Sequence, residues 1–194
     1  MDSYEGNIYD PITLHKYLYA NADGINKIDP SGNISISAEL QGLAVRASLF
    51  ISSVGAGIQR AFQSGTIGNF WRALGEKSER FAEAVLALKP GLIVDRNIPV
   101  ANRFIDFFVR LGDRTAFIEV KYSLPSRLGP SMDRLVGQVN AATASNQGQV
   151  VVWTLKEPTQ AQVRLVTTQI GNSQVQFVHG VEGLYNWIRL YFGV

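Results

Sequence analysis

The hydrophobic pattern of the chain becomes regular from about residue 70. Residues 71–88 carry apolar side chains at helical spacing, and Pro90-Gly91 then end the run. Beyond this point, β-branched and aromatic runs alternate with helical patterns. The predicted strands are residues 92–100, 103–111, 114–122, 149–155 and 174–178, and the further helices are 132–145, 159–170 and 181–192. This order predicts an α/β fold with a mixed central sheet flanked by helices.

Two segments of different character precede this domain. Residues 1–33 are rich in Tyr, Asn, Asp, Gly and Pro and show no helical period, and residues 34–69 are mostly small and apolar or neutral. The most apolar stretch, residues 40–58, is interrupted by Arg46 and rich in Gly and Ser. We therefore expect a packed helix and no stable membrane insertion. The predicted division is an arm at 1–33, a helical linker region at 34–69 and the α/β domain at 70–194.

One predicted hairpin brings charged residues together. If Gly112-Asp113 form a two-residue turn, Asp106 and Glu119 become direct cross-strand partners, with Cβ atoms about 4.5–5.5 Å apart. Lys121 lies two residues past Glu119 and points the same way. The predicted opposite face of the hairpin is apolar and comprises Ile105, Phe107, Val109, Leu111, Ala116, Ile118, Val120 and Tyr122.

Two facing carboxylates repel each other unless a cation binds between them. The chain has no cysteine and two histidines, His15 and His179, so oxygen ligands would have to dominate a metal site. Oxygen ligands favour Mg²⁺ or Mn²⁺. The alternative is a solvated hairpin on which Lys121 neutralises the two acids. Three aromatic residues predicted on the charged face favour a site over that alternative; they are Phe104, Phe108 and Phe117.

Neighbouring helices offer further polar groups. Glu79 lies between Glu76 and Glu83 on the helix that precedes the hairpin, and Gln138 on the later helix could position water or phosphate. Residues 1–69 contain four basic and six acidic side chains, which leaves fourteen basic and ten acidic for the rest. This mildly basic part suits a polyanionic substrate. The candidate nucleic-acid-binding residues are Lys77, Arg80, Arg103 and Arg127.

The sequences Gly-Glu-Lys-Ser-Glu-Arg-Phe at 75–81, Phe-Ile-Asp at 104–106 and Phe-Ile-Glu-Val-Lys at 117–121 resemble the core of the PD-(D/E)xK nucleases. Archaeal Holliday-junction resolvases are similar in style. The resemblance covers about residues 74–155. It implies a metal-dependent nuclease, most simply a DNase, with Glu79 as the helix-borne acid, Asp106 and Glu119 as metal ligands, Lys121 as the catalytic lysine and Gln138 on the following helix.

The proline that gives that motif its name is replaced by Ile105. This departure leaves open whether the substrate is DNA or RNA. An RNA-cleaving enzyme of the same fold is therefore one alternative. A non-catalytic module that only binds nucleic acid or a partner is another. Two facing acids argue against the second, because a purely structural hairpin has no need of them.

The N-terminal arm resembles the end of the Rhs-repeat core. The resemblance rests on Tyr-Asp-Pro-Ile-Thr at 9–13, Tyr-Leu-Tyr-Ala-Asn at 17–21 and Asp-Pro-Ser-Gly at 29–32, with Asp23-Gly24 where many relatives carry a proline. It implies an antibacterial toxin that is delivered by a secretion system, such as type VI, into the cytoplasm of rival cells. It also implies delivery proteins and an immunity protein that protects the producer. The alternative is an ordinary turn-rich arm.

Overall fold

The computed structural model describes residues 38–171 and 175–193. The chain divides into two compact units, residues 1–42 and 43–194. Of the first unit, only the residues that begin the first helix are described, so the predicted Rhs-like arm at 1–33 lies outside the described residues. Apart from the start of that helix, everything that follows concerns the second unit.

The elements follow the predicted order. The helices are α1 (Ala38–Gln63), α2 (Ile67–Ala87), α3 (Pro130–Ala144), α4 (Gln160–Ile170) and α5 (Gly180–Phe192). The strands are β1 (Ile93–Val100), β2 (Arg103–Leu111), β3 (Arg114–Lys121), β4 (Gln149–Thr154) and β5 (Gln176–His179). Because α2 already begins at Ile67, the predicted start of the last domain at residue 70 falls inside a helix. The division into arm, linker and domain stays a prediction.

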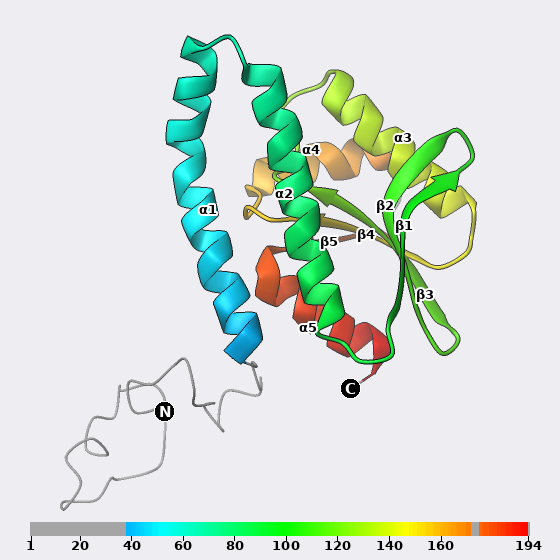
Figure 1. Ribbon diagram of the computed structural model, residues 1–194. Coiled ribbons are helices and arrows are strands. Elements are labelled where there is room, and N and C mark those ends of the chain that lie inside the picture. The colour runs from blue at the N-terminus through cyan, green and yellow to red at the C-terminus, as the bar shows by residue number, and fades with distance from the viewer. Residues whose placement is uncertain (1–37, 172–174, 194) are drawn as a thin grey trace, which may run out of the picture. The chain divides into compact units, whose positions relative to one another are not determined.

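The sheet is five-stranded and mixed, in the order β1-β2-β3-β4-β5 (Figure 1). The pairs β1–β2 and β2–β3 are antiparallel, whereas β3–β4 and β4–β5 are parallel. Hairpins join the first three strands, and helices make the crossovers to β4 and β5, as parallel pairing requires. The predicted class, an α/β fold with a mixed central sheet flanked by helices, is confirmed.

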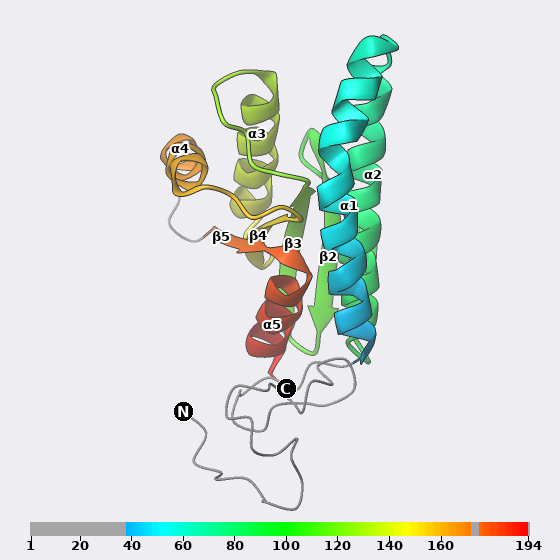
Figure 2. The same ribbon diagram turned by 90° about the vertical axis from the view of Figure 1, so that its left-hand side faces the viewer.

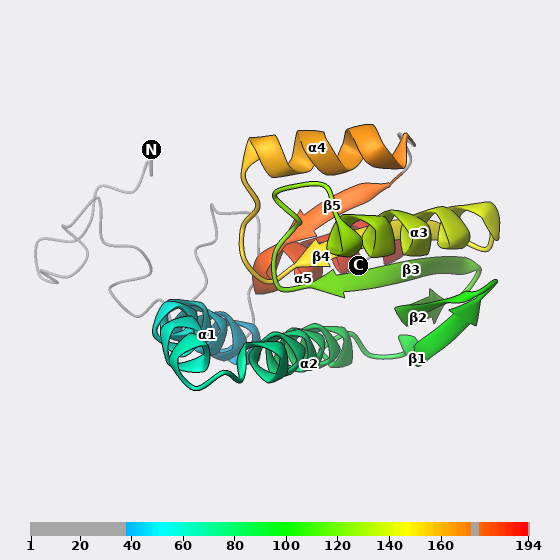
Figure 3. The ribbon, with the colours of Figure 1, turned by 90° about the horizontal axis from the view of Figure 1, so that it is seen from above.

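Helices cover both faces of the sheet. Seen from above, α3 and α4 lie on one face, and α1 and α2 lie on the other (Figure 3). On the α3 side, a hydrophobic cluster gathers Phe117, Leu135, Val139 and Val152 with side chains of α4. On the α2 side, α5 packs against α2, β4 and β5. Burial of these two apolar layers is the main term that stabilises the fold.

Helices α1 and α2 form an antiparallel pair (Figures 1 and 2). Gly57 of α1 leaves room for Phe70 of α2, because a Cβ at position 57 would lie 2.6 Å from the Phe70 ring. Farther along, the Phe50 and Phe81 rings pack with centroids 5.9 Å apart. By length and composition α1 could cross a membrane, and only 17% of its most apolar 18-residue window is buried. The predicted helix is therefore present, and within the described part of the chain little of its surface is buried.

The hairpin between β2 and β3 has the predicted register. Gly112 adopts a positive φ of 58°, which glycine tolerates, and Leu111 pairs with Arg114. The ladder then runs to the pair Phe107–Ile118, one pair short of Asp106 and Glu119. Beyond that point only the outer pairings continue, β2 with β1 and β3 with β4. The two strands therefore part at the place where the predicted acidic residues lie.

The predicted apolar face of the hairpin needs one correction. Ile105 belongs to the hydrophobic cluster with Phe117 on the α3 side, so the alternation between Ile105 and Phe107 is broken at Asp106. At the same level in β1, Asn97 takes a left-handed φ of 51°, between the pairs Arg96–Phe107 and Ile98–Ile105. Phe108 and Phe117 pack with ring centroids 4.7 Å apart within this core, and Phe104 is exposed.

Candidate active site

The charged end of β3 is buried. Phe117 belongs to the core beneath α3, and strand alternation places Glu119 and Lys121 on that same face. Glu119 is only 1% exposed, and its Oε1 accepts a hydrogen bond from Nζ of Lys121. The lysine side chain itself remains 25% exposed. β3 thus presents a carboxylate inside the protein with a cation between it and the solvent.

Asp106 lies on β2, one residue beyond the end of the β2–β3 ladder. Its Oδ2 accepts a hydrogen bond of 2.7 Å from the backbone amide of Val120. A side chain therefore satisfies a β3 amide beyond the end of the β2–β3 ladder. Because Val120 follows Glu119 directly in β3, the same contact holds the Asp106 carboxylate close to Glu119.

Burial governs the electrostatics of the two acids. Desolvation raises the pKa of Glu119 to about 7; Lys121 opposes this increase, and the charge of Asp106 adds to it. Desolvation also raises the pKa of Asp106, again against the effect of Lys121. An acid in this environment is ionised at low cost only when a further cation is close.

The donor set fits a hard divalent cation. The second oxygen of Glu119, Oε2, is buried and has no hydrogen-bond partner among the described residues. Together with the Asp106 carboxylate it offers the oxygen ligands that Mg²⁺ and Mn²⁺ prefer. Within residues 38–171 and 175–193, no three His, Cys, Asp or Glu side chains are gathered as a metal-binding group. Protein ligation would therefore come from two carboxylates, and Mg²⁺ commonly completes its shell with waters and substrate oxygens.

Glu79 approaches the same place from α2. Desolvation raises its pKa, and the charge of Asp106 raises it further, so the two carboxyl groups are close enough to interact. Its partner is Arg96 of β1, whose guanidinium lies 3.6 Å from Glu79 and 3.1 Å from Glu83. Arg96 also lies over the Phe107 ring. The structure thus adds to the site Arg96, a residue that was not among the predicted site residues.

Gln138 of α3 is bonded to β2, the strand that carries Asp106. It is 8% exposed, and its Nε2 donates a 2.8 Å hydrogen bond to the carbonyl of Phe104, two residues before Asp106. Its Oε1 is buried without a partner among the described residues, as is Oγ1 of Thr154. Thr154 pairs with Lys121 across β3 and β4. Unpaired buried polar atoms are costly and usually mark a place for water or a ligand.

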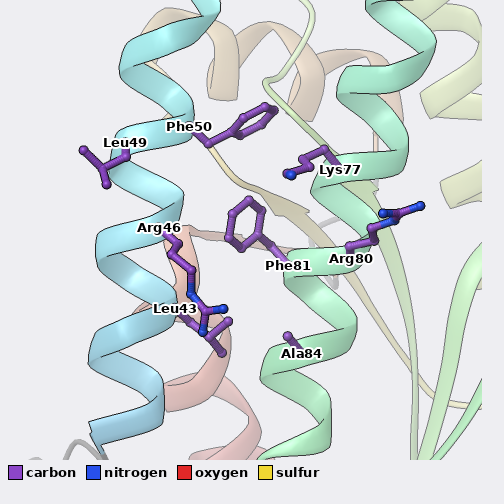
Figure 4. A pocket seen from close by; sticks show the side chains of 8 residues that line it. All are labelled: Leu43, Arg46, Leu49, Phe50, Lys77, Arg80, Phe81 and Ala84. Atoms are coloured by element: carbon purple, nitrogen blue, oxygen red, sulfur yellow. The ribbon is translucent and has the colours of Figure 1, made fainter.

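The four predicted nucleic-acid-binding cations do not share one surface. Arg103 lies against α3, since a Cβ on Gly137 would come within 3.0 Å of its guanidinium. Arg127 is exposed in the loop before α3. Lys77 and Arg80 instead line a pocket between α1 and α2 (Figure 4). The structure therefore separates Lys77 and Arg80 from the two arginines on the α3 side.

Comparisons with known proteins place the chain in no family. No family model matches it, and no curated protein matches it. Among solved structures, SfsA from Pyrococcus furiosus in complex with Ca²⁺ is similar, with 14% identity and a TM-score of 0.40. The match covers 56% of this chain and 56% of that chain, so this chain spans about half the length of SfsA. A similarity of that degree assigns no role to any residue here.

Proposed function

We propose that this protein is a metal-dependent nuclease that hydrolyses phosphodiester bonds in DNA, with a PD-(D/E)xK core spanning α2 to β4. The observation that carries the proposal is the buried Glu119 with the half-buried Asp106 and with Lys121 beside it, at the point where β2 and β3 part. Such a cluster costs stability in the metal-free protein. A function that uses it accounts for its presence.

Asp106 and Glu119 would hold a Mg²⁺ or Mn²⁺ ion, which when bound would polarise a phosphoryl oxygen and lower the pKa of a bound water. Hydrolysis joins a water oxygen to phosphorus and breaks the bond to the leaving sugar oxygen, which then takes up a proton. Lys121 would place its ammonium group against the negative charge that develops on the phosphoryl oxygens.

Two further side chains would support this arrangement. The free oxygen of Gln138 would accept a hydrogen bond from an ordered water beside Glu119. Glu79, held by Arg96, would supply a third carboxylate near Asp106. RNA cleavage by the same groups is the alternative, because none of them distinguishes a ribose from a deoxyribose.

The test is incubation of the purified full-length chain with plasmid DNA and, separately, with total RNA, each with Mg²⁺, with Mn²⁺ and with EDTA. Glu119→Gln should abolish cleavage, whereas Glu182→Gln, on the exposed part of α5, should cleave like the wild type. Equal cleavage by wild type and Glu119→Gln would show that a contaminant or another site is responsible. RNA cleavage without DNA cleavage would select the alternative substrate.

We further propose that the nuclease is an antibacterial toxin that acts in the cytoplasm of a target cell and is neutralised by an immunity protein. The support is the Rhs-like sequence of residues 9–32, joined to the candidate nuclease domain in one chain. Tightly induced cytoplasmic expression in a naive bacterium should kill, and Glu119→Gln should remove killing. Co-expression of the neighbouring downstream gene should restore growth. Harmless expression of an active enzyme would reject the toxin role and leave the nuclease proposal intact.

A further inference from the structure

A pocket of about 440 Å³ lies between α1 and α2 (Figure 4). Its floor and sides are apolar, and three cationic side chains border it. The lining residues are Leu43, Arg46, Leu49, Phe50, Lys77, Arg80, Phe81 and Ala84, and we call this set the α1–α2 groove.

Two of the three cationic side chains that border the groove have no acidic partner among the described residues. Lys77 and Arg80 are exposed, and neither forms an ion pair within the part of the chain that the structure describes. The ammonium group of Lys77 lies 5.8 Å from the centroid of the Phe50 ring, which steadies it without neutralising it. Two such cations side by side on one helix turn attract a partner that carries carboxylates.

The groove is also flanked by exposed apolar surface. Leu49 is 67% exposed at its outer edge, and Val45, one turn earlier on α1, is 58% exposed. Exposed apolar residues beside an apolar pocket, with charge at the border, are typical of a surface that another protein covers. Contact with a partner would bury Val45 and Leu49, and it would explain the low burial of α1 among the residues that the structure describes.

We propose that the α1–α2 groove binds a segment of a partner protein in which carboxylates flank an apolar side chain. The apolar side chain would enter the groove against Phe50 and Leu43, and the carboxylates would pair with Lys77 and Arg80. This inference goes beyond nuclease activity and does not depend on it.

Nucleic acid fits the groove less well. Base stacking needs an open aromatic face, but Lys77 covers one face of Phe50 and Phe81 is buried. A membrane surface also fits less well, because the exposed positions of α1 include Ser48, Ser52 and Gln59 between its apolar residues. A concave pocket with cations at its border matches a protruding protein segment better than a flat bilayer.

The groove is distinct from the candidate active site. Lys77 and Glu79 are two residues apart on α2, which is about 200° around a helix, so they point in different directions. Glu79 interacts with Arg96 and Asp106, whereas Lys77 contacts Phe50 of α1. A partner in the groove would therefore bind beside the catalytic groups and would not have to displace substrate from them.

The experiment pans a library of random 16-residue displayed peptides on the full-length chain. The strongest enriched peptide is then labelled with fluorescein, and its dissociation constant is measured by anisotropy. We expect enriched peptides to place Asp or Glu next to Leu, Phe or Trp. The Lys77→Glu/Arg80→Glu double variant should weaken binding at least about tenfold, as loss of two close charge pairs implies. Leu49→Ser should weaken it as well, at unchanged net charge.

The matched control is the double reversal Arg134→Glu/Arg164→Glu, two exposed arginines on α3 and α4, which should leave peptide affinity unchanged. Enrichment of peptides without acidic residues, or equal binding by the Lys77→Glu/Arg80→Glu variant, would overturn the proposal. A single-stranded 20-nucleotide DNA and vesicles rich in phosphatidylglycerol are titrated in parallel. If Lys77→Glu/Arg80→Glu weakens binding of the DNA or of the vesicles but not of the peptide, the groove binds nucleic acid or lipid, and the proposal is wrong.

Discussion

The carboxylate of Asp106 accepts a hydrogen bond from the backbone amide of Val120, the residue that separates Glu119 from Lys121. This hydrogen bond connects β2 to β3 just beyond the end of their ladder. It joins Asp106, a candidate metal ligand, to the strand that carries Glu119 and Lys121. Asp106 thus has a structural role and a proposed chemical role. Substitutions that separate these two roles are the most informative at this position.

Replacement of Asp106 should give different outcomes with asparagine and with alanine. Asparagine keeps an oxygen that accepts the Val120 amide but removes the charge that a metal ion needs. We expect Asp106→Asn to lose at least about a hundredfold in cleavage rate with little change in Tm. Alanine leaves the amide unpaired and should cost a further 1–3 kcal/mol or so of stability. Plasmid cleavage and thermal unfolding measure the two effects; equal unfolding temperatures for both variants would contradict the structural role.

Glu119→Gln should stabilise the metal-free protein at pH 8. Burial raises the pKa of Glu119 from its ordinary 4.5 to about 7. The folded state therefore binds a proton that the unfolded chain has released, and stability falls as pH rises from about 4.5 through 7. Glutamine removes this cost and should raise the unfolding free energy by about 1 kcal/mol or more, or Tm by about 2–4 °C.

The comparison is made in EDTA, at pH 8 and at pH 5, where the carboxyl group of the folded protein is already protonated. The stabilising effect of Glu119→Gln should shrink at pH 5. A variant that is less stable than the wild type at pH 8 would show that the Glu119 carboxylate is well compensated in the metal-free fold.

Lys121→Ala should lower the cleavage rate strongly and affect folding much less. The ammonium group is partly exposed and lies on the charged face of β3, so its removal leaves the apolar core intact. Removing a positioned cation that stabilises transition-state charge commonly costs about 10²–10³ in rate. Lys89→Ala, after the end of α2, is the matched control and should keep full activity. Near-wild-type cleavage by Lys121→Ala would mean that the lysine only neutralises Glu119.

Among the three acids of α2, Glu79 should matter most for cleavage. Its pKa responds to Asp106, whereas Glu83 shares Arg96 at the surface, and no such partner is found for Glu76 among the described residues. Alanine at position 79 should lower activity about 10–100-fold, the usual effect of losing a supporting group around a metal site. Glu76→Ala serves as the control. A larger loss at Glu83 than at Glu79 would reassign the helix-borne acid.

Sequence patterns were enough to place the helices, the strands and the hairpin register, because each depends on local periodicity and turn chemistry. That register predicted Asp106, Glu119 and Lys121 at one place. In the structure the β2–β3 ladder ends one pair before Asp106 and Glu119, and the Asp106 carboxylate reaches the Val120 amide instead. The reversal of Ile105 could not be foreseen, because it accompanies a left-handed conformation of Asn97 on another strand, which the alternation within β2 does not reveal. The partnership of Arg96 with Glu79, and the position of Lys77 and Arg80 in the groove, depend on how α2 docks on its neighbours. Helical periodicity carries no information about that docking.

Divalent metal should stabilise the fold as well as support cleavage. Asp106 and Glu119 are both desolvated and adjacent, and one oxygen of Glu119 has no donor among the described residues. A cation between the two carboxylates relieves their repulsion, and binding to the folded state alone adds about 2.7 kcal/mol at a hundredfold excess over the dissociation constant. Titration with Mn²⁺ should therefore raise the Tm of the wild type. It should have little effect on Asp106→Asn or Glu119→Gln, and EDTA should abolish DNA cleavage. The thermal shift separates a metal that binds this site from one that merely accompanies the substrate. Full cleavage in EDTA, or an equal shift in all three proteins, would refute a metal site formed by Asp106 and Glu119.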